Sequence, residues 1–220
     1  MRKCEWRDLG WVDYQQAFEL QQQLVEDRKQ DQIPDQFLIV EHPHTITMGR
    51  NGHMEHLLAA PEALEGAGIS FHETDRGGDV TYHGPGQIVG YPIVDLRSWK
   101  RDVVAYVRSI EQVLIDALAD FGIAAGRLHG CTGVWVAGEK IAAIGVHISR
   151  WITSHGFALN HTTDLSYFRY IVPCGLAKPV TSMAKLGVSA SREEVVERLI
   201  VHFGKVFECQ VEELIMETAL

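Results

Sequence analysis

The sequence lacks the cysteine patterns that mark metal-binding and disulfide-stabilised proteins. Its four cysteines, at positions 4, 131, 174 and 209, are scattered along 220 residues with no C-x-x-C pair. Such spacing argues against a zinc knuckle or a disulfide framework, so free thiols are expected. Basic charge is also scarce, with 20 Lys and Arg against 29 Asp and Glu and a formal net charge of -9. Because phosphate contacts need clustered Lys and Arg, this balance argues against nucleic-acid binding.

Long apolar segments are missing as well. No apolar run reaches the ~18 residues that a membrane span needs, and the N-terminus lacks the apolar region of a secretory signal. No low-complexity tract or linker divides the chain. We therefore expect one domain over residues 1–220, no membrane association and a cytoplasmic location.

Hydrophobic periodicity predicts a mixture of helices and short strands. The expected helices cover 13–29, 102–121 and segments that begin at Pro61 and Ser191. The expected strands cover 37–40, 45–50, 69–72, 88–94, 133–136, 140–147, 156–160 and, as an edge strand, 209–211. Short strands, mostly linked as hairpins, favour the α+β class, with mixed sheets and helices packed on them, or a mixed sheet with helices on one face. In the helix over 102–121 we expect Arg108, Glu111 and Asp116 to face solvent.

A glycine-rich stretch, R-G-G-D-V-T-Y-H-G-P-G-Q at 76–87, stands out from the rest. Four glycines and a proline interrupt an alternating strand pattern, so a ligand can approach the backbone closely. The polar groups of this stretch suit the binding of a carbonyl or another acyl polar group. The alternative is a glycine-rich hairpin whose polar groups are satisfied internally.

Two further segments have small residues where strands are expected. The hairpin over 133–147 carries Lys140 just past its turn and then Ala142, Ala143 and Gly145. The segment 156–160, G-F-A-L-N, repeats this character. An acyl chain could lie over these bare stretches, and close packing of neighbouring elements explains them equally well.

Cys174 is a candidate nucleophile because Pro173 and Gly175 place it in a constrained turn. Cys131, in a glycine-flanked loop, is its rival. A thiol with a pKa of about 8.5 is mostly protonated at neutral pH and needs a positive neighbour or a base. Lys140 is the candidate for that role, although a lysine beside a turn is more often a solvated charge.

Histidine pairs at 42/44 and 53/56 raise the question of a metal site. Neither pair is followed by a glutamate and a third ligand at the spacing of a catalytic zinc site, so we expect no metal.

The stretch at 76–87, followed by Tyr91-Pro92, resembles the signature of the lipoyl(octanoyl) transferases, as does G-E-K-I at 138–141 with the later Gly145. The resemblance runs from Glu41-His42-Pro43 through Cys174-Gly175 and implies a catalytic domain like that of the biotin and lipoate protein ligases, with no cofactor. It implies Cys174 and Lys140 as the catalytic dyad. It also implies substrate contacts at Arg76, Gly77, Gly78, Asp79, Val80, Thr81, Tyr82, His83, Ala143, Ile144, Gly145, Gly156, Phe157 and Ala158.

The implied reaction is the first step of endogenous lipoate biosynthesis. An octanoyl group moves from octanoyl-acyl carrier protein to Cys174 and then to a lysine of a lipoyl domain, in 2-oxoacid dehydrogenase complexes or the glycine cleavage H protein. His83 and Tyr91 would orient groups around the thiol. The carrier is acidic, so docking on this acidic chain needs a local basic patch, for which Arg97, Lys100 and Arg101 form the densest cluster near the loop in sequence.

Two other functions stay open. An ATP-dependent lipoate or biotin protein ligase shares the expected fold, and the absence of a Walker A loop does not exclude it because these ligases also lack one. The second open function is that of a non-catalytic module that binds an acyl group or its carrier.

Overall fold

The computed structural model describes residues 1–172 and 178–214. Its strands are β1 (Arg2–Trp11), β2 (Asp35–Glu41), β3 (Thr45–Met48), β4 (Ser70–Glu73), β5 (Val80–His83), β6 (Gln87–Ile93), β7 (Gly126–Leu128), β8 (Cys131–Val136), β9 (Glu139–Ser149), β10 (Ile152–Asn160) and β11 (Cys209–Glu213). Its helices are α1 (Tyr14–Lys29), α2 (Pro61–Gly66), α3 (Val103–Ala119) and α4 (Arg192–Phe207), with 3-10 turns η1 (Met54–His56) and η2 (Leu165–Tyr170).

The strands of the described chain form a large and a small sheet. The large sheet has the order β11-β1-β2-β6-β10-β9-β8-β7. In it β1 runs parallel to both β11 and β2, and the remaining pairs are antiparallel. The small sheet has the order β4-β3-β5. The prediction of β11 as an edge strand is confirmed.

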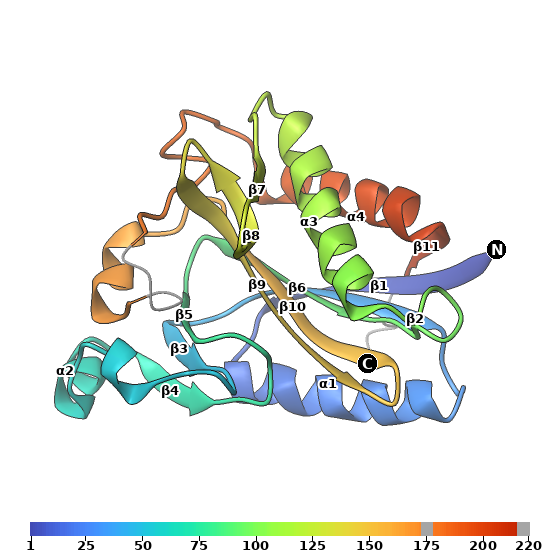
Figure 1. The fold of residues 1–220 in the computed structure, drawn as a ribbon, viewed down its shortest axis with the longest axis horizontal. Helices are drawn as coiled ribbons and strands as arrows, with labels where there is room; N and C mark the ends of the chain where they lie inside the picture. The colour runs from blue at the N-terminus through green and yellow to red at the C-terminus, as the bar shows by residue number, and fades with distance from the viewer. Residues whose placement is uncertain (173–177, 215–220) are drawn as a thin grey trace, which may run out of the picture.

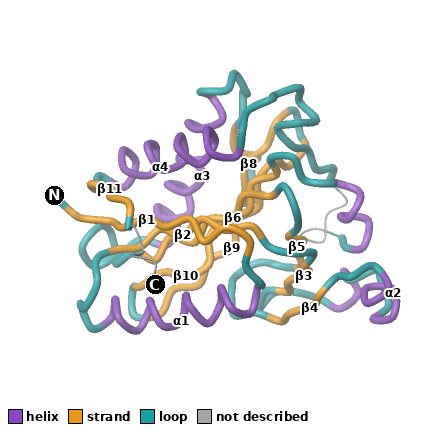
Figure 2. Tube along the Cα trace, turned by 180° about the vertical axis from the view of Figure 1, so that it is seen from behind, coloured by secondary structure: helices purple, strands orange, loops and turns teal. Residues whose placement is uncertain are grey.

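Helices cover both faces of the large sheet (Figures 1 and 2). Side chains alternate along β2: Phe37 and Ile39 pack in the core with α3 and α4, whereas Leu38 and Val40 pack in the core with α1. The α+β class is therefore confirmed, and the alternative with helices on one face is wrong. No helix of residues 1–172 and 178–214 is long and apolar enough to cross a membrane.

Local signals in the sequence set the helix starts. The side chains of Asp13 and Asp102 each accept a backbone N–H in the first turn of the helix that follows. Ser191 and Glu194 form a complete capping box at the start of α4. Gly122, just past α3, has a φ of +74°, which explains why that helix stops there.

The glycine-rich stretch does not form a hairpin. Its strand β5 pairs with β3 in the small sheet, while β6, only three residues further on, pairs with β2 and β10 in the large sheet. The turn at residues 84–86 therefore carries the chain from one sheet to the other. At Gly86 the φ is +76°, and a Cβ would lie 2.7 Å from the carbonyl carbon of Thr162. Both the conformation and the space at this turn call for glycine.

The sequence pattern missed β1 and β7. β1 has few fully buried side chains and is stabilised by parallel pairing with β2 and β11, which lie far away in the sequence. β7 has three residues and pairs only with β8 among the described strands. Neither strand carries a hydrophobic alternation strong enough to be read locally.

The predicted solvent exposure of Glu111 is wrong. Its side chain is 0% exposed, and its carboxylate pairs with Arg108 and with Arg127 of β7. The second carboxylate oxygen accepts the backbone N–H of Gly133 at 3.2 Å. This carboxylate ties α3 to β7 and β8, which lie far from it in the sequence.

We expect Glu111→Gln to lower the free energy of unfolding by about 1–3 kcal/mol, because the variant loses charge-assisted hydrogen bonds to two arginines. Urea unfolding measures this change. Glu197→Gln on α4 is the matched control, since that side chain is 63% exposed, and its effect should stay within about 0.5 kcal/mol. Equal effects of the two substitutions would contradict the role assigned to Glu111.

Candidate active site

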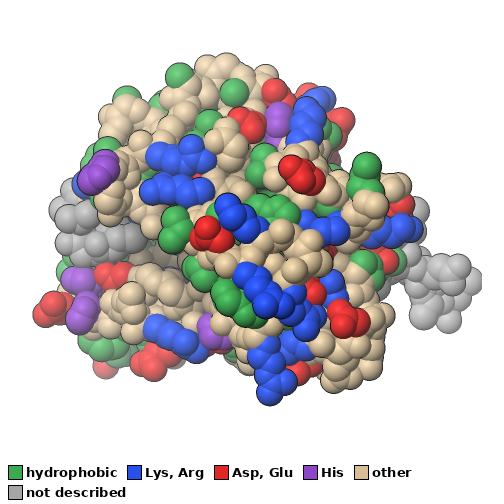
Figure 3. All heavy atoms as spheres, turned by 45° about the vertical axis from the view of Figure 1, so that its right-hand side comes forward, with side chains coloured by type: hydrophobic (Ala, Val, Ile, Leu, Met, Phe, Trp, Pro, Cys, Tyr) green, Lys and Arg blue, Asp and Glu red, His purple; other side chains and the backbone are tan. Residues whose placement is uncertain are grey.

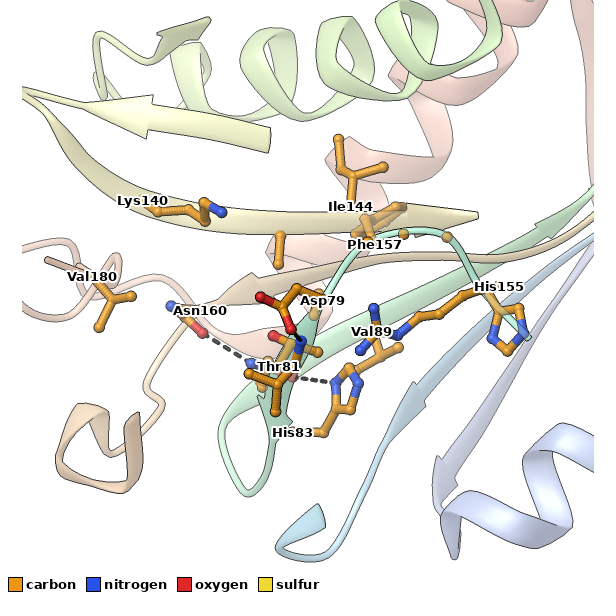
Figure 4. Close-up of a pocket in the computed structure, with 18 of the residues that line it drawn as sticks. Asp79, Thr81, His83, Val89, Lys140, Ile144, His155, Phe157, Asn160 and Val180 are labelled. Atoms are coloured by element: carbon orange, nitrogen blue, oxygen red, sulfur yellow. Dashed lines mark hydrogen bonds between the residues drawn. The ribbon is translucent and has the colours of Figure 1, made fainter. Parts of the chain in front are cut away.

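A narrow pocket of about 60 Å³ lies on the α1 side of the large sheet, beneath the small sheet. Its floor is formed by β6, β9 and β10, through Gln87, Val89, Tyr91, Ala143, Ile144, Gly145, Gly156, Phe157, Ala158 and Asn160. Residues of the glycine-rich stretch cover it, and Tyr14 of α1 also lines it. Among the side chains labelled in Figure 4, Val180 and Lys140 lie toward one end of the row and His155 lies at the other. We call this cavity the inner pocket.

A larger groove of about 580 Å³ adjoins it. Its walls come from residues 51–56, 77–79, 130–135 and 144–146, with Val107, Lys178 and Val180. We call it the outer groove. The two cavities share the residues Gly78, Asp79, Lys140, Ile144, Gly145 and Val180. Lys140 therefore stands where a narrow, mostly apolar pocket opens into a wide groove.

Lys140 is buried, with 8% of its surface exposed. Its backbone N–H donates to the Pro179 carbonyl, and its own carbonyl accepts from the Thr181 N–H, both at 2.9 Å. The ammonium nitrogen lies 4.8 Å from the ring centre of Trp135, within range of a cation–π contact. The alternative reading of Lys140 as a solvated charge is wrong, because strand pairing to residues 179–181 holds it against the protein interior.

Two glycines let other backbone segments approach the sheet. Gly145 and Gly156 face each other across β9 and β10. A Cβ on Gly145 would lie 2.9 Å from the Gly77 oxygen, and one on Gly156 would lie 2.1 Å from the Gly90 oxygen. The close-packing explanation therefore holds for these glycines, although both also line the inner pocket. The open space of the pocket depends more on Ala143 and Ala158, the small residues beside them.

Arg76 is a buried guanidinium, 7% exposed, that connects the two sheets. Its terminal nitrogen donates to the carbonyl of Thr47 in β3 at 2.6 Å and to the hydroxyl of Thr47 at 2.9 Å. The next residue, Gly77, donates its N–H to the Val146 carbonyl of β9 at 2.8 Å. Arg76 thus holds the small sheet over the inner pocket.

Neutral polar groups line the pocket between these charges. Gln87 donates to Asn160 Oδ1 at 3.0 Å, and its oxygen accepts from His83 Nδ1 at 2.9 Å (Figure 4). Asn160 in turn donates to the Thr181 carbonyl at 3.0 Å. Burial lowers the pKa of His83 to about 3, so its imidazole is neutral at physiological pH.

His42 lies behind the pocket and fixes Tyr91. Its Nδ1 donates to the Val12 carbonyl at 2.7 Å, and its Nε2 accepts from the Tyr91 hydroxyl at 2.8 Å. Burial lowers the pKa of His42 to about 4. A neutral ring matches the one donor and one acceptor that these partners require.

The structure brings most of the predicted contact residues together. All of them line the inner pocket except Gly77, which lines the outer groove, and Tyr82, which lines neither. The Tyr82 hydroxyl is hydrogen-bonded to His44 at 2.8 Å, and its ring stacks on Tyr167. Tyr82 alternates with Thr81 and His83 along β5 and packs in the small-sheet core. Cys174 lies outside the described residues.

Several lining residues had no signal in the sequence. Tyr14 reaches the pocket from α1, and Phe168 reaches it from η2. His155 has a φ of +55°, and its ring stacks on Phe18 of α1. In a regular strand, residues 155 and 157 would lie on the same face of the sheet. Residue 157 packs on the face opposite to α1, so regular alternation would place residue 155 there as well. A left-handed backbone conformation within a strand has no marker in a single sequence.

The histidine pairs serve hydrogen bonds. His44 bonds Tyr82, and His56 Nδ1 lies 2.5 Å from an Asp79 oxygen. Within residues 1–172 and 178–214, no group of three or more His, Cys, Asp or Glu side chains is placed to hold a metal ion.

Comparison with known proteins places this chain in a family. The family model of the lipoyl protein ligase A/B catalytic domain matches residues 13–204. The chain belongs to this family. An octanoyltransferase of Solibacter usitatus is 64% identical to it over 211 residues, which cover 96% of each chain. An octanoyltransferase of Koribacter versatilis is 55% identical over 93% of this chain and 84% of its own.

Solved structures of the family share the fold at low sequence identity. A lipoate-protein ligase A bound with ATP superposes with a TM-score of 0.75 at 17% identity and covers 98% of this chain and 90% of its own. A bipartite lipoate protein ligase of Thermoplasma acidophilum gives a TM-score of 0.79 at 16% identity, covering 99% and 89%. The predicted fold, the resemblance to octanoyltransferases and the assignment as an acyltransferase are confirmed.

We expect the burial of neutral His42 to make stability fall on acidification. Its pKa is about 4 in the folded chain and about 6.5 in the unfolded chain, which therefore takes up the proton first. Stability is lost as the pH falls from roughly 6.5 to 4, by up to about 1.4 kcal/mol per pH unit. His42→Gln should remove that part of the pH slope in urea unfolding, whereas His129→Gln, at an exposed histidine, should leave it. An unchanged slope in His42→Gln would contradict the neutral, buried state of His42.

Proposed function

We propose that this chain, as one catalytic domain, transfers an octanoyl group from octanoyl-acyl carrier protein to a lysine of a lipoyl domain through a thioester on Cys174. Lys140 carries the proposal, because it stands at the junction of a narrow, mostly apolar pocket and a wide groove open to a protein-borne substrate. The high identity to octanoyltransferases supports the substrate.

In the first half-reaction, the Lys140 ammonium favours the thiolate of Cys174. The thiolate attacks the carbonyl carbon of the octanoyl thioester, and the bond from that carbon to the carrier's phosphopantetheine sulfur breaks. The carrier leaves as a free thiol after its sulfur takes up a proton from the Lys140 ammonium, which leaves the Lys140 amine neutral. The octanoyl group is then bound to Cys174.

In the second half-reaction, the amine of a lysine on the lipoyl domain attacks the enzyme thioester. The new amide bond forms as the bond to the Cys174 sulfur breaks, and Lys140 accepts a proton from the attacking amine. The acceptors would be the lipoyl domains of 2-oxoacid dehydrogenase complexes and the glycine cleavage H protein. No nucleotide enters either step, because a thioester already carries the acyl group in activated form.

The residues that flank 173–177 support a nucleophile at this junction. On one side, the Val172 N–H donates to the His56 carbonyl at 2.8 Å, at the wall of the outer groove. On the other side, Val180 forms a bridge with Lys140. Cys131 is a credible rival because it lines the same groove, with its sulfur 3.5 Å from the Lys178 ammonium. Experiment must therefore separate the two thiols.

The inner pocket is suited to a short saturated chain. An extended backbone advances about 3.5 Å for every three bonds, so the seven C–C bonds of an octanoyl group span about 8 Å. From Lys140 to Ala143, β9 advances about 10 Å. A chain that begins near the Lys140 ammonium would therefore end beside Ala143 and Ala158. Each buried methylene contributes about 0.8 kcal/mol to binding.

We expect Cys174→Ser to abolish a covalent octanoyl adduct, because the hydroxyl is a much weaker nucleophile than the thiolate. Cys131→Ser should retain the adduct. Intact-mass measurement after exposure to octanoyl-carrier detects the adduct in both variants. An adduct on Cys174→Ser and none on Cys131→Ser would identify Cys131 as the nucleophile.

The same assay separates the competing functions. If the wild type transfers nothing to a lipoyl domain until ATP and free octanoic acid are added, the chain is a ligase. If it binds octanoyl-carrier but gains no covalent mass and transfers nothing, it is a binding module. Transfer from octanoyl-carrier without nucleotide supports the proposal.

We expect Ala143→Leu to lower kcat/KM for octanoyl transfer by at least tenfold, since the larger side chain fills the pocket where the end of the acyl chain would lie. Transfer of a butanoyl group should fall much less. Ala119→Leu, on the exposed end of α3, is the matched control and should leave both rates unchanged. Equal losses for the two acyl lengths would contradict this placement of the chain.

A further inference from the structure

The outer groove carries hydrogen-bond donors that the transfer chemistry does not use. The Lys178 ammonium lies 3.5 Å from the Cys131 sulfur and 5.3 Å from the ring centre of Trp135. Within the described part of the chain, Lys178 forms no salt bridge with a carboxylate. An ammonium has three N–H donors, so the weak contact with sulfur leaves donor capacity at the groove wall.

Trp135 contacts both ammonium groups in the same wall. Its side chain lines the outer groove and is 6% exposed. The indole nitrogen itself has less than 1 Å² of accessible surface, so it is closed to a ligand in the groove. The donors of this wall that remain for a ligand are therefore those of Lys178.

The charge of the groove has the opposite sign to that of the chain. Lys140 and Lys178 line it, and Asp79 is the one carboxylate among its described lining residues. The Asp79 oxygens already accept from His56 and from the N–H of Val80. The groove therefore offers donors and positive charge to a ligand, within a chain whose formal net charge is -9.

The cluster proposed from sequence as a carrier contact is a weaker candidate. Arg97 is ion-paired with Asp95 and Asp31, and Lys100 lies near Asp102. Asp31 lies just beyond the C-terminal end of α1, whereas Tyr14 at the other end of that helix lines the inner pocket. On the face shown in Figure 3, some Asp and Glu side chains lie among the Lys and Arg side chains. Recognition of the donor is better sought in the groove itself.

We propose that the outer groove binds the amide-bearing arm of the acyl donor, with Lys178 donating hydrogen bonds to its amide carbonyl oxygens. This inference rests on the proposed function, because the arm must enter through the groove to bring its thioester to Lys140. Both ammonium nitrogens lie about 5 Å from the Trp135 ring centre, at 4.8 and 5.3 Å. The contacts therefore fall on the part of the arm next to the thioester, within about 10 Å of it.

The test compares two small donors. Octanoyl-pantetheine carries two amides, whereas S-ethyl thiooctanoate has the same acyl thioester and no amide. Lys178→Met keeps the aliphatic stem and removes the donors. This variant should raise KM for octanoyl-pantetheine about threefold to tenfold and leave kcat/KM for S-ethyl thiooctanoate unchanged. Lys185→Met, at a lysine paired with Glu139 and outside the groove lining, is the matched control.

The outcomes separate this inference from the proposed function. If the wild type transfers octanoyl neither from a small donor nor from octanoyl-carrier, the proposed function is wrong. If the wild type accepts both small donors and Lys178→Met loses activity equally on both, the assignment of the arm is wrong and the function stands. Inhibition of the wild type by AMP but not by free pantetheine would also overturn it, by assigning the groove to a nucleotide.

Discussion

The buried guanidinium of Arg76 is the interaction on which the site depends. It bonds Thr47 of the small sheet, while the neighbouring Gly77 bonds Val146 of the large sheet. Removing a cation from water costs free energy unless hydrogen-bond acceptors replace the water. A buried guanidinium is therefore stable only where several acceptors surround it. Gly145 makes room for this contact, because any side chain there would meet Arg76 and Gly77. The Arg76–Thr47 and Gly77–Val146 contacts thus link the small sheet to the large sheet beside the inner pocket.

Burial also determines which side chains of the inner pocket carry charge. Lys140 and Arg76 line the inner pocket, whereas burial lowers the pKa of His83 and His42 and keeps both rings neutral. Each neutral ring has one donor and one acceptor and is held by matching partners. Cationic side chains near the reaction and neutral imidazoles around it suit a site that must favour a thiolate.

The fold and most of the pocket could be predicted because their signals are local. Caps at Asp13, Asp102 and Ser191 mark the helix starts, and the glycine-rich stretch and the small residues at 143–145 and 156–158 mark the pocket walls. Glu111 was misread because its partners lie in other elements, on β7 and β8. Tyr14 and Phe168 were missed because a residue's place around a cavity depends on how distant elements pack.

The sequence alone determined the fold class, the family and the segments that meet at the site, because glycine, caps and periodic apolar residues act over a few positions of the chain. Only the tertiary structure decided that β5 and β6 belong to different sheets, that Lys140 is buried at the junction of two cavities, and that Tyr82 packs in the small-sheet core. These outcomes depend on pairing between strands far apart in sequence, whose energy comes from contacts that no local pattern encodes.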